Sequence, residues 1–159
     1  MKVFEYDRVL AVNYAKEWAF DRNPNYYNFD KLGGDCTNFI SQCVYAGAQV
    51  MNYQKDYGWY YNSLNDRAPA WTGVLPFARF LLFNNNVGPF ARTVPLSDAR
   101  VGDVIQLYKK GEFFHSLIIT SIVGERINVS AHTKDVFDIP LYSYYFEKAR
   151  CLHIEGVRK

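Results

Sequence analysis

Large apolar residues near the start of the chain recur four positions apart, with charged residues between them. These residues are Tyr6, Leu10, Tyr14 and Trp18. The pattern predicts an amphipathic helix with these side chains on its apolar face, ending before Pro24. Residues 21–34 are rich in Asn, Gly and Pro, and they predict a loop.

Two further helices are predicted in the first half of the chain. One runs from Cys36 to about Tyr45 and ends at Gly47. Its apolar face consists of Phe39, Ile40, Cys43 and Val44. The other covers residues 74–83 and is followed by three consecutive asparagines. Residues 48–71 lack a clean periodicity, although they contain many aromatic rings.

The second half of the chain changes to patterns that are typical of strands. Four segments rich in β-branched and aromatic residues are separated by turns, which predicts antiparallel strands. They are residues 103–108, 113–122, 126–133 and 149–156. Helices followed by strands predict an α+β fold. Because a chain of 159 residues suits one core, we expect residues 1–159 to form a single domain.

Composition narrows the class of protein. Hydrophobic residues make up 49% and aromatic residues 18%, which excludes a disordered chain. The formal net charge is +2 with no Lys/Arg cluster, so no nucleic-acid partner is expected. Charged residues interrupt residues 1–20, unlike a signal peptide, and the apolar run at 74–83 is too short to cross a membrane. We expect a soluble monomer whose location the sequence leaves open.

Cys36 follows two glycines and an aspartate at the predicted start of a helix. Gly33 and Gly34 permit a sharp turn, and Asp35 can cap the helix by accepting from its first amides. The helix dipole favours an anion at this position, and therefore a reactive thiolate. Burial as a small apolar residue is the common alternative for a free cysteine.

The other two cysteines, Cys43 and Cys151, lie in apolar patterns and are predicted to be core residues. Cys36 and Cys43 would stand two helical turns apart, roughly 10 Å along the axis, which is too far for a disulfide. The spacings fit no zinc site, and no other metal or cofactor motif is present.

A thiolate nucleophile needs a base, and histidines occur in two neighbouring predicted strands, His115 in one and His132 in the next. If Gly124 and Glu125 form a type II′ hairpin turn, the register places both histidines on one face of the sheet, as diagonal neighbours. A slip of one residue would place them on opposite faces. His153 is expected to be structural or solvated.

These residues supply the parts of a Cys–His–polar triad. Cys36 would attack, His115 would take and return the proton, and His132 would orient His115 through the second ring nitrogen. Asp135 and Asn128 are the alternatives for the third position. The backbone N–H of Cys36 is an expected oxyanion donor, because helix N-termini offer free amides.

Aromatic residues gather in the stretch that follows the predicted nucleophile helix. They are Trp59, Tyr60, Tyr61 and Trp71. Rings in loops often line clefts that bind peptides or sugars, so we expect these four residues, together with Asp35, to contact the substrate. A buried cluster beneath the loops is the alternative arrangement.

The motifs GGDCTNFISQC, GWYY, PAWTGV, VGDVIQL, HSLIIT and SAHTKD occur in this order between about Phe4 and Ile154. They resemble the putative amidase domain of bacterial proteins, which is similar to the papain-like hydrolases of the NlpC and CHAP kind. The resemblance implies a helix carrying the nucleophile, packed on an antiparallel sheet carrying the histidine. By motif, Cys36 matches the nucleophile, His115 the base and His132 the third polar position.

The expected function is therefore that of a cysteine hydrolase, which cleaves an amide or peptide bond through a thioester acyl-enzyme. Peptides from bacterial cell-wall peptidoglycan are the expected substrates, and no cofactor is expected. The same residues could instead transfer the acyl group to an amine. A papain-like module that binds a peptide or glycan without cleaving it is the alternative from another class.

Overall fold

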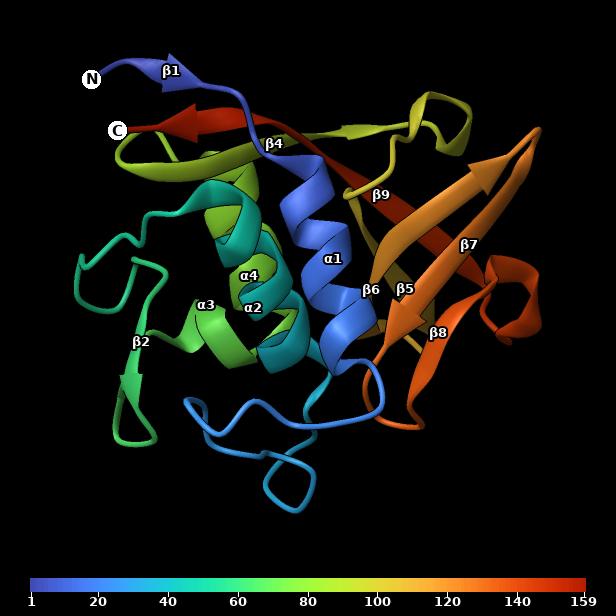
Figure 1. Cartoon of the computed structure of the whole chain (residues 1–159), viewed down its shortest axis with the longest axis horizontal. Coiled ribbons are helices and arrows are strands. Elements are labelled where there is room, and N and C mark those ends of the chain that lie inside the picture. Colours follow the sequence, from blue (N-terminus) through green and yellow to red (C-terminus); the bar gives the residue numbers. More distant parts are fainter.

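Helices occupy the first half of the chain and most strands the second half in the computed structural model, which describes residues 1–159 (Figure 1). The helices are α1 (Arg8–Trp18), α2 (Cys36–Ala48), α3 (Pro69–Thr72) and α4 (Val74–Phe83), with 3-10 turns at Leu96–Asp98 and Leu141–Ser143. The strands are β1 (Val3–Phe4), β2 (Tyr61–Ser63), β3 (Asp66–Arg67), β4 (Gly88–Val94), β5 (Val104–Lys109), β6 (Glu112–Val123), β7 (Arg126–Ala131), β8 (Val136–Pro140) and β9 (Lys148–Arg158). The predicted α+β class is confirmed.

The predicted helices form close to their expected bounds. α4 covers residues 74–83 as predicted, and α2 begins at Cys36 but continues through Gly47, which was expected to end it. Gly47 serves a close approach instead, because a Cβ there would lie 2.5 Å from the backbone oxygen of Asp7. None of the helices combines the length and the hydrophobicity needed to span a bilayer.

The buried face of α1 differs from the expected one. Its fully buried residues are Ala11 and Ala15, whereas Leu10 is 44% exposed. A spacing of four residues drifts around a helix with 3.6 residues per turn, so the four large residues cannot share one stripe. The small alanines let α1 pack closely on α2, and Tyr14 and Trp18 lie at the edge of this contact.

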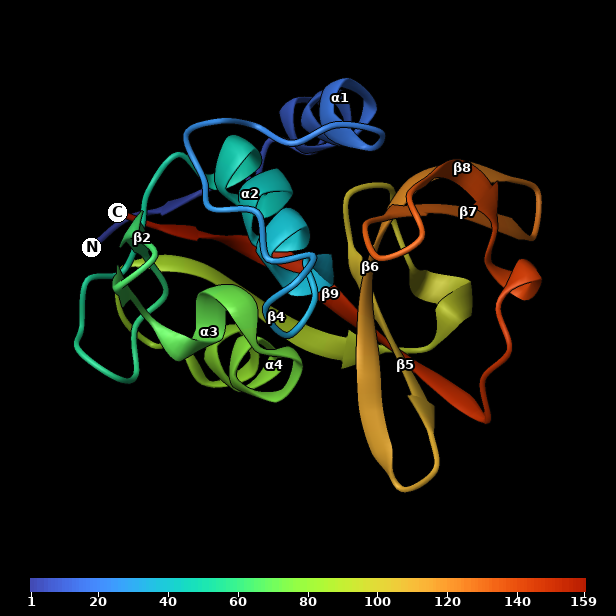
Figure 2. The ribbon, with the colours of Figure 1, turned by 90° about the horizontal axis from the view of Figure 1, so that it is seen from below.

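One antiparallel sheet of seven strands has the order β1-β9-β5-β6-β7-β8, and β4 also pairs with β9. β9 therefore pairs with three other strands, β1, β4 and β5. Three strands of this sheet, β1, β4 and β8, were not predicted from the sequence, nor was the separate β2–β3 hairpin; β4 begins with Gly88 and Pro89, which obscure its strand signal. In Figure 2, α2 lies between α1 and the α3–α4 pair, while β5 to β8 extend to one side of the helices.

Two hydrophobic cores lie on opposite faces of the central strands. The larger one is formed by the helices and residues such as Val104 and Ile118. The smaller one is formed by the strands β5 to β7 and the turn after β8, with residues such as Ile105 and Leu117. Because side chains alternate along a strand, consecutive residues of β6 point to different cores. This alternation decides where the candidate site residues point.

Asp103 joins α1 to the sheet. Its carboxylate is 0% exposed and accepts from Arg8 Nη1 at 2.8 Å and from the Ile154 N–H at 3.1 Å. Its Oδ2 lies 2.8 Å from His153 Nδ1. His153 thus has the structural role that was expected of it. Cys151, two residues before His153, is buried as predicted.

Candidate active site

Cys36 is the first residue of α2 and is half-buried, whereas Cys43 and Cys151 are buried. The turn before it depends on Gly33 and Gly34, whose φ angles of 84° and 98° are left-handed. No hydrogen bond from the Cys36 N–H is present, as expected for the first residue of a helix. The thiol and a free amide therefore lie together at the positive end of the helix dipole.

Asp35 does not cap α2, contrary to the prediction. Its Oδ1 accepts from the Phe29 N–H at 2.8 Å and from Asn38 Nδ2 at 2.9 Å, and its Oδ2 lies 2.6 Å from His132 Nδ1. The carboxylate points back into the protein, where it fixes the loop that precedes Cys36. Because Asp35 is 0% exposed, the prediction that it contacts the substrate is also wrong.

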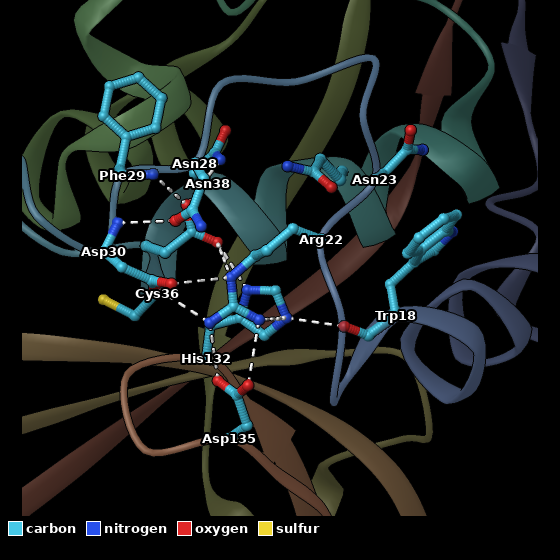
Figure 3. A network of polar contacts seen from close by, with 12 residues as sticks. Trp18, Arg22, Asn23, Asn28, Phe29, Asp30, Cys36, Asn38, His132 and Asp135 are labelled. Atoms are coloured by element: carbon cyan, nitrogen blue, oxygen red, sulfur yellow. Dashed lines mark hydrogen bonds and ion pairs between the residues drawn. The ribbon is translucent and has the colours of Figure 1, made fainter.

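His132 is buried in a polar network that includes Asp35, the residue before Cys36 (Figure 3). Its Nε2 lies 2.7 Å from the Trp18 carbonyl oxygen and 3.2 Å from Arg22 Nη1, and Phe39 stacks on its ring at a centroid distance of 3.8 Å. With Nδ1 held by Asp35, both ring nitrogens have partners, and no hydrogen bond joins His132 to His115. The predicted orienting contact between the two histidines is not made.

A β-bulge is the reason for this separation. The Gly124-Glu125 turn forms as expected, and Val123 pairs with Arg126. Gly124 alone of the two has a positive φ, 61°, as a type II′ turn requires. The register then shifts by one residue between Ile119 and Ser121, so the two histidines leave the sheet on opposite faces.

The two alternatives for the third position also contact other residues. Asp135 binds Arg22 Nη2 at 2.9 Å, in the same network as His132. Asn128 donates from Nδ2 to Ser121 Oγ at 2.9 Å, and its Oδ1 is buried without a partner. Neither residue forms a hydrogen bond with His115.

His115 pairs with Leu107 of β5, and its ring lies on the side of the smaller core. It is 7% exposed. Burial, and secondly the charge of Lys109, lower its pKa from 6.5 to about 4. The imidazole is therefore neutral at pH 7 and can accept a proton. Its ring lies 5.6 Å from the ring of Tyr144, between centroids.

Tyr144, which follows the turn after β8, lies beside His115 and close enough to Cys36 for the charge of a thiolate there to act on its hydroxyl. Its hydroxyl is buried without a hydrogen-bond partner. Burial, and secondly the negative charge of a Cys36 thiolate, raise the pKa of Tyr144 to about 12, so the hydroxyl stays a donor. The sequence carries no signal for this residue, because nothing in the pattern separates it from the other 12 tyrosines.

A second link joins the neighbours of Cys36 and His115. Thr37 Oγ1 lies 3.0 Å from Ser116 Oγ, which connects the residue after Cys36 to the residue after His115. No direct hydrogen bond joins Cys36 to His115. The structure thus brings Cys36, His115 and Tyr144 into one region, and it places His132 and Asp35 behind this region.

The aromatic residues expected in a cleft are mostly core residues. Trp59 and Trp71 are both 0% exposed, with ring centroids 4.8 Å apart, so the prediction that they contact the substrate is wrong. Their indole N–H groups donate to Ser41 and Asn38 of α2, which explains their burial beneath that helix. Tyr61 is 9% exposed, and Tyr60 alone of the four remains half-exposed.

No group of three or more His, Cys, Asp or Glu residues is arranged to hold a metal ion. The chemical groups at the candidate site are a thiol, a neutral imidazole, a phenol and a free helix amide. These groups suit nucleophilic attack on a carbonyl carbon.

Comparison with known proteins gives a family match. A family model described as a putative amidase domain matches residues 5–154. The uncharacterized protein YhbB of Bacillus subtilis (strain 168) is 34% identical over 140 residues, which cover 84% of this chain and 43% of YhbB. The uncharacterized protein YjcM of the same strain is 29% identical over 145 residues, covering 85% and 32%. This chain thus spans less than half the length of either relative, and no solved structure matches it.

Proposed function

This chain belongs to the putative amidase domain family, and on that basis we propose that it is a cysteine hydrolase that cleaves an amide or peptide bond. One observation carries the proposal. Cys36 alone of the three cysteines is partly accessible, and it lies at a helix N-terminus in the same region as His115 and Tyr144. The helix that carries it packs on the antiparallel sheet that carries His115, which supports a papain-like arrangement within a single domain.

The proposed reaction begins with transfer of the Cys36 thiol proton to His115. The thiolate attacks the carbonyl carbon, and the negative charge that develops on the carbonyl oxygen is stabilised by two donors, the Cys36 N–H and the Tyr144 hydroxyl. His115 then gives its proton to the leaving nitrogen as the C–N bond breaks, which leaves a thioester on Cys36. A water molecule attacks the thioester while His115 accepts a proton from it; the C–S bond breaks, the acid leaves, and His115 returns the proton to the Cys36 sulfur.

Two features of the site bear on this sequence of steps. His115 is neutral at pH 7, so its ring can take the thiol proton, but a pKa of about 4 makes it a weak base, and the Cys36 thiolate must raise that pKa as the ion pair forms. Catalytic hydrogen bonds are often long or absent before substrate binds, so a missing Cys36–His115 bond is compatible with the reaction. The proposed mechanism assigns no residue to a third triad position, because His132 is held by Asp35 and the Trp18 carbonyl.

Peptides of bacterial cell-wall peptidoglycan are the proposed substrates, on the resemblance to NlpC and CHAP hydrolases alone. The test compares the intact protein with Cys36→Ala, His115→Gln and a matched Cys43→Ala control, each incubated with purified cell-wall fragments. Mass spectrometry should detect cleavage products with the intact protein and the control only. Products extended by an added amine, such as glycinamide, would instead indicate acyl transfer.

Alkylation provides a second measurement that needs no substrate. Iodoacetamide at pH 6 should modify Cys36 faster than the buried Cys43 and Cys151, and His115→Gln should slow this reaction. Equal and slow labelling of all three cysteines, with no cleavage of any fragment, would refute the hydrolase proposal and favour a binding module.

A further inference from the structure

A line of polar side chains, buried except for the half-buried Arg150 at its start, runs from β9 through the sheet to the nucleophile helix. Arg150 of β9 contacts Gln106 of β5, with Nη2 at 2.6 Å and Nε at 3.0 Å from Oε1. Gln106 Nε2 lies 3.2 Å from Ser116 Oγ of β6, and Ser116 Oγ lies 3.0 Å from Thr37 Oγ1 of α2. Thr37 Oγ1 lies 3.8 Å from Cys36 Sγ. The line therefore ends at the proposed nucleophile.

These side chains lie where α2 packs on the sheet, and this contact is otherwise apolar. Gln106 and Ser116 are 0% exposed and Thr37 is 1% exposed, and their neighbours belong to the larger core. Burial of polar side chains opposes folding unless they are hydrogen-bonded, so an apolar contact would suffice if this region only joined α2 to the sheet. Four connected polar side chains from four elements indicate a further role.

The direction of the hydrogen bonds follows from the chemistry of the side chains. The guanidinium of Arg150 can only donate, which makes Gln106 Oε1 the acceptor and Gln106 Nε2 the donor. Nε2 donates one hydrogen to the Val74 carbonyl oxygen at 2.9 Å and the other to Ser116 Oγ. The Ser116 hydroxyl hydrogen is then free to point at Thr37, and the Thr37 hydroxyl hydrogen at the sulfur.

We propose that Arg150, Gln106, Ser116 and Thr37 form a hydrogen-bond relay that presents the Thr37 hydroxyl hydrogen to Cys36 Sγ and stabilises its thiolate. A positive charge at one end and a donor at the other polarise the line in the sense that favours an anion on sulfur. Thr37 is a positioning residue in this proposal, since it acts through Cys36. The inference rests on the proposed role of Cys36 as the nucleophile.

The test measures the rate of iodoacetamide alkylation at Cys36 between pH 4 and 9, resolved by peptide mass spectrometry. Thr37→Val keeps the shape of the side chain without the hydroxyl, and Ser116→Ala breaks the relay one step earlier. Each should move the midpoint of the pH profile upward by about half to one unit, which is about a three- to tenfold slower reaction at pH 6. Thr37→Ser retains the hydroxyl and should keep the original profile.

Ser41→Ala is the matched control. Ser41 is also a fully buried hydroxyl of α2, but it donates to the Trp71 carbonyl oxygen at 2.8 Å, outside the relay. It should leave the profile unchanged. Arg150→Met acts at the half-buried far end, where it removes both donors to Gln106 Oε1 without changing Thr37 or Ser116, and should give a smaller shift of the same sign.

Superimposed profiles for Thr37→Val, Ser116→Ala and the intact protein would overturn the relay, and if one of these two variants fails to fold, the other and Arg150→Met decide the matter. The outcome is separable from that of the proposed function. Shifted profiles in a protein that cleaves no amide would retain the relay and refute the hydrolase. Cleavage with unshifted profiles would retain the hydrolase and refute the relay.

Discussion

Acidification should destabilise this protein through His115. Burial, with the charge of Lys109 as the second cause, lowers the pKa of His115 from 6.5 to about 4. Between these two values the unfolded chain binds a proton that the folded chain does not, so the free energy of unfolding falls as the pH falls from 6.5 to 4. Each pH unit across this window corresponds to about 1.4 kcal/mol. The loss attributable to His115 is therefore about 3 kcal/mol at pH 4 and about 2 kcal/mol at pH 5.

The assay is urea unfolding of the intact protein and of His115→Gln, followed by tryptophan fluorescence at pH 7, 6, 5 and 4.5. Other groups titrate in both proteins, so the informative quantity is the difference between the two pH dependences. The intact protein should lose about 2 kcal/mol more than the variant between pH 7 and pH 5. Parallel curves would refute the reasoning, because they would mean that the folded protein accommodates a charged imidazole at this position.

Three further substitutions test other parts of the structure. Tyr144→Phe should lower kcat by about 10²-fold through loss of an oxyanion donor, yet leave the free energy of unfolding unchanged or raise it by about 1 kcal/mol, because the hydroxyl has no partner to lose; steady-state kinetics and urea unfolding check both. Asp35→Ala should lower the free energy of unfolding by about 3–5 kcal/mol, since His132 loses its buried partner, and a loss below about 1 kcal/mol in urea unfolding would contradict this. Gly47→Ala should cost about 1–3 kcal/mol by calorimetry, because the new Cβ meets the Asp7 oxygen, and an unchanged Tm would show that α1 and α2 can separate freely.

The sequence predicted elements whose signal is local. The helix at 74–83 and the start of α2 at Cys36 follow from apolar spacing and from turn residues within a few positions. The hairpin turn is predicted in the same way, from Gly124 itself, whose positive φ suits the first position of a type II′ turn. For these parts, neighbours in the sequence carry enough of the free energy to decide the conformation.

The errors concern features that depend on distant residues. The bulge before Ser121 depends on how β6 fits both β5 and β7. It places His115 and His132 on opposite faces of the sheet instead of the same face. Burial of Trp59 and Trp71 depends on partners in α2, which a period within residues 48–71 does not reveal. Ring-rich sequence alone does not separate a cleft from a core.

The central strand β9 has a consequence for biosynthesis. It runs from Lys148 to Arg158 and supplies the pairing edge for β1, β4 and β5, which lie as far away in sequence as Val3. Contacts of such long sequence separation form slowly. While a ribosome is still making β9, α1 and α2 can form, but β4 and β5 still lack the strand that pairs with both of them. We therefore expect the domain to complete its folding only once β9 has left the ribosome, with open strand edges exposed to chaperones until then.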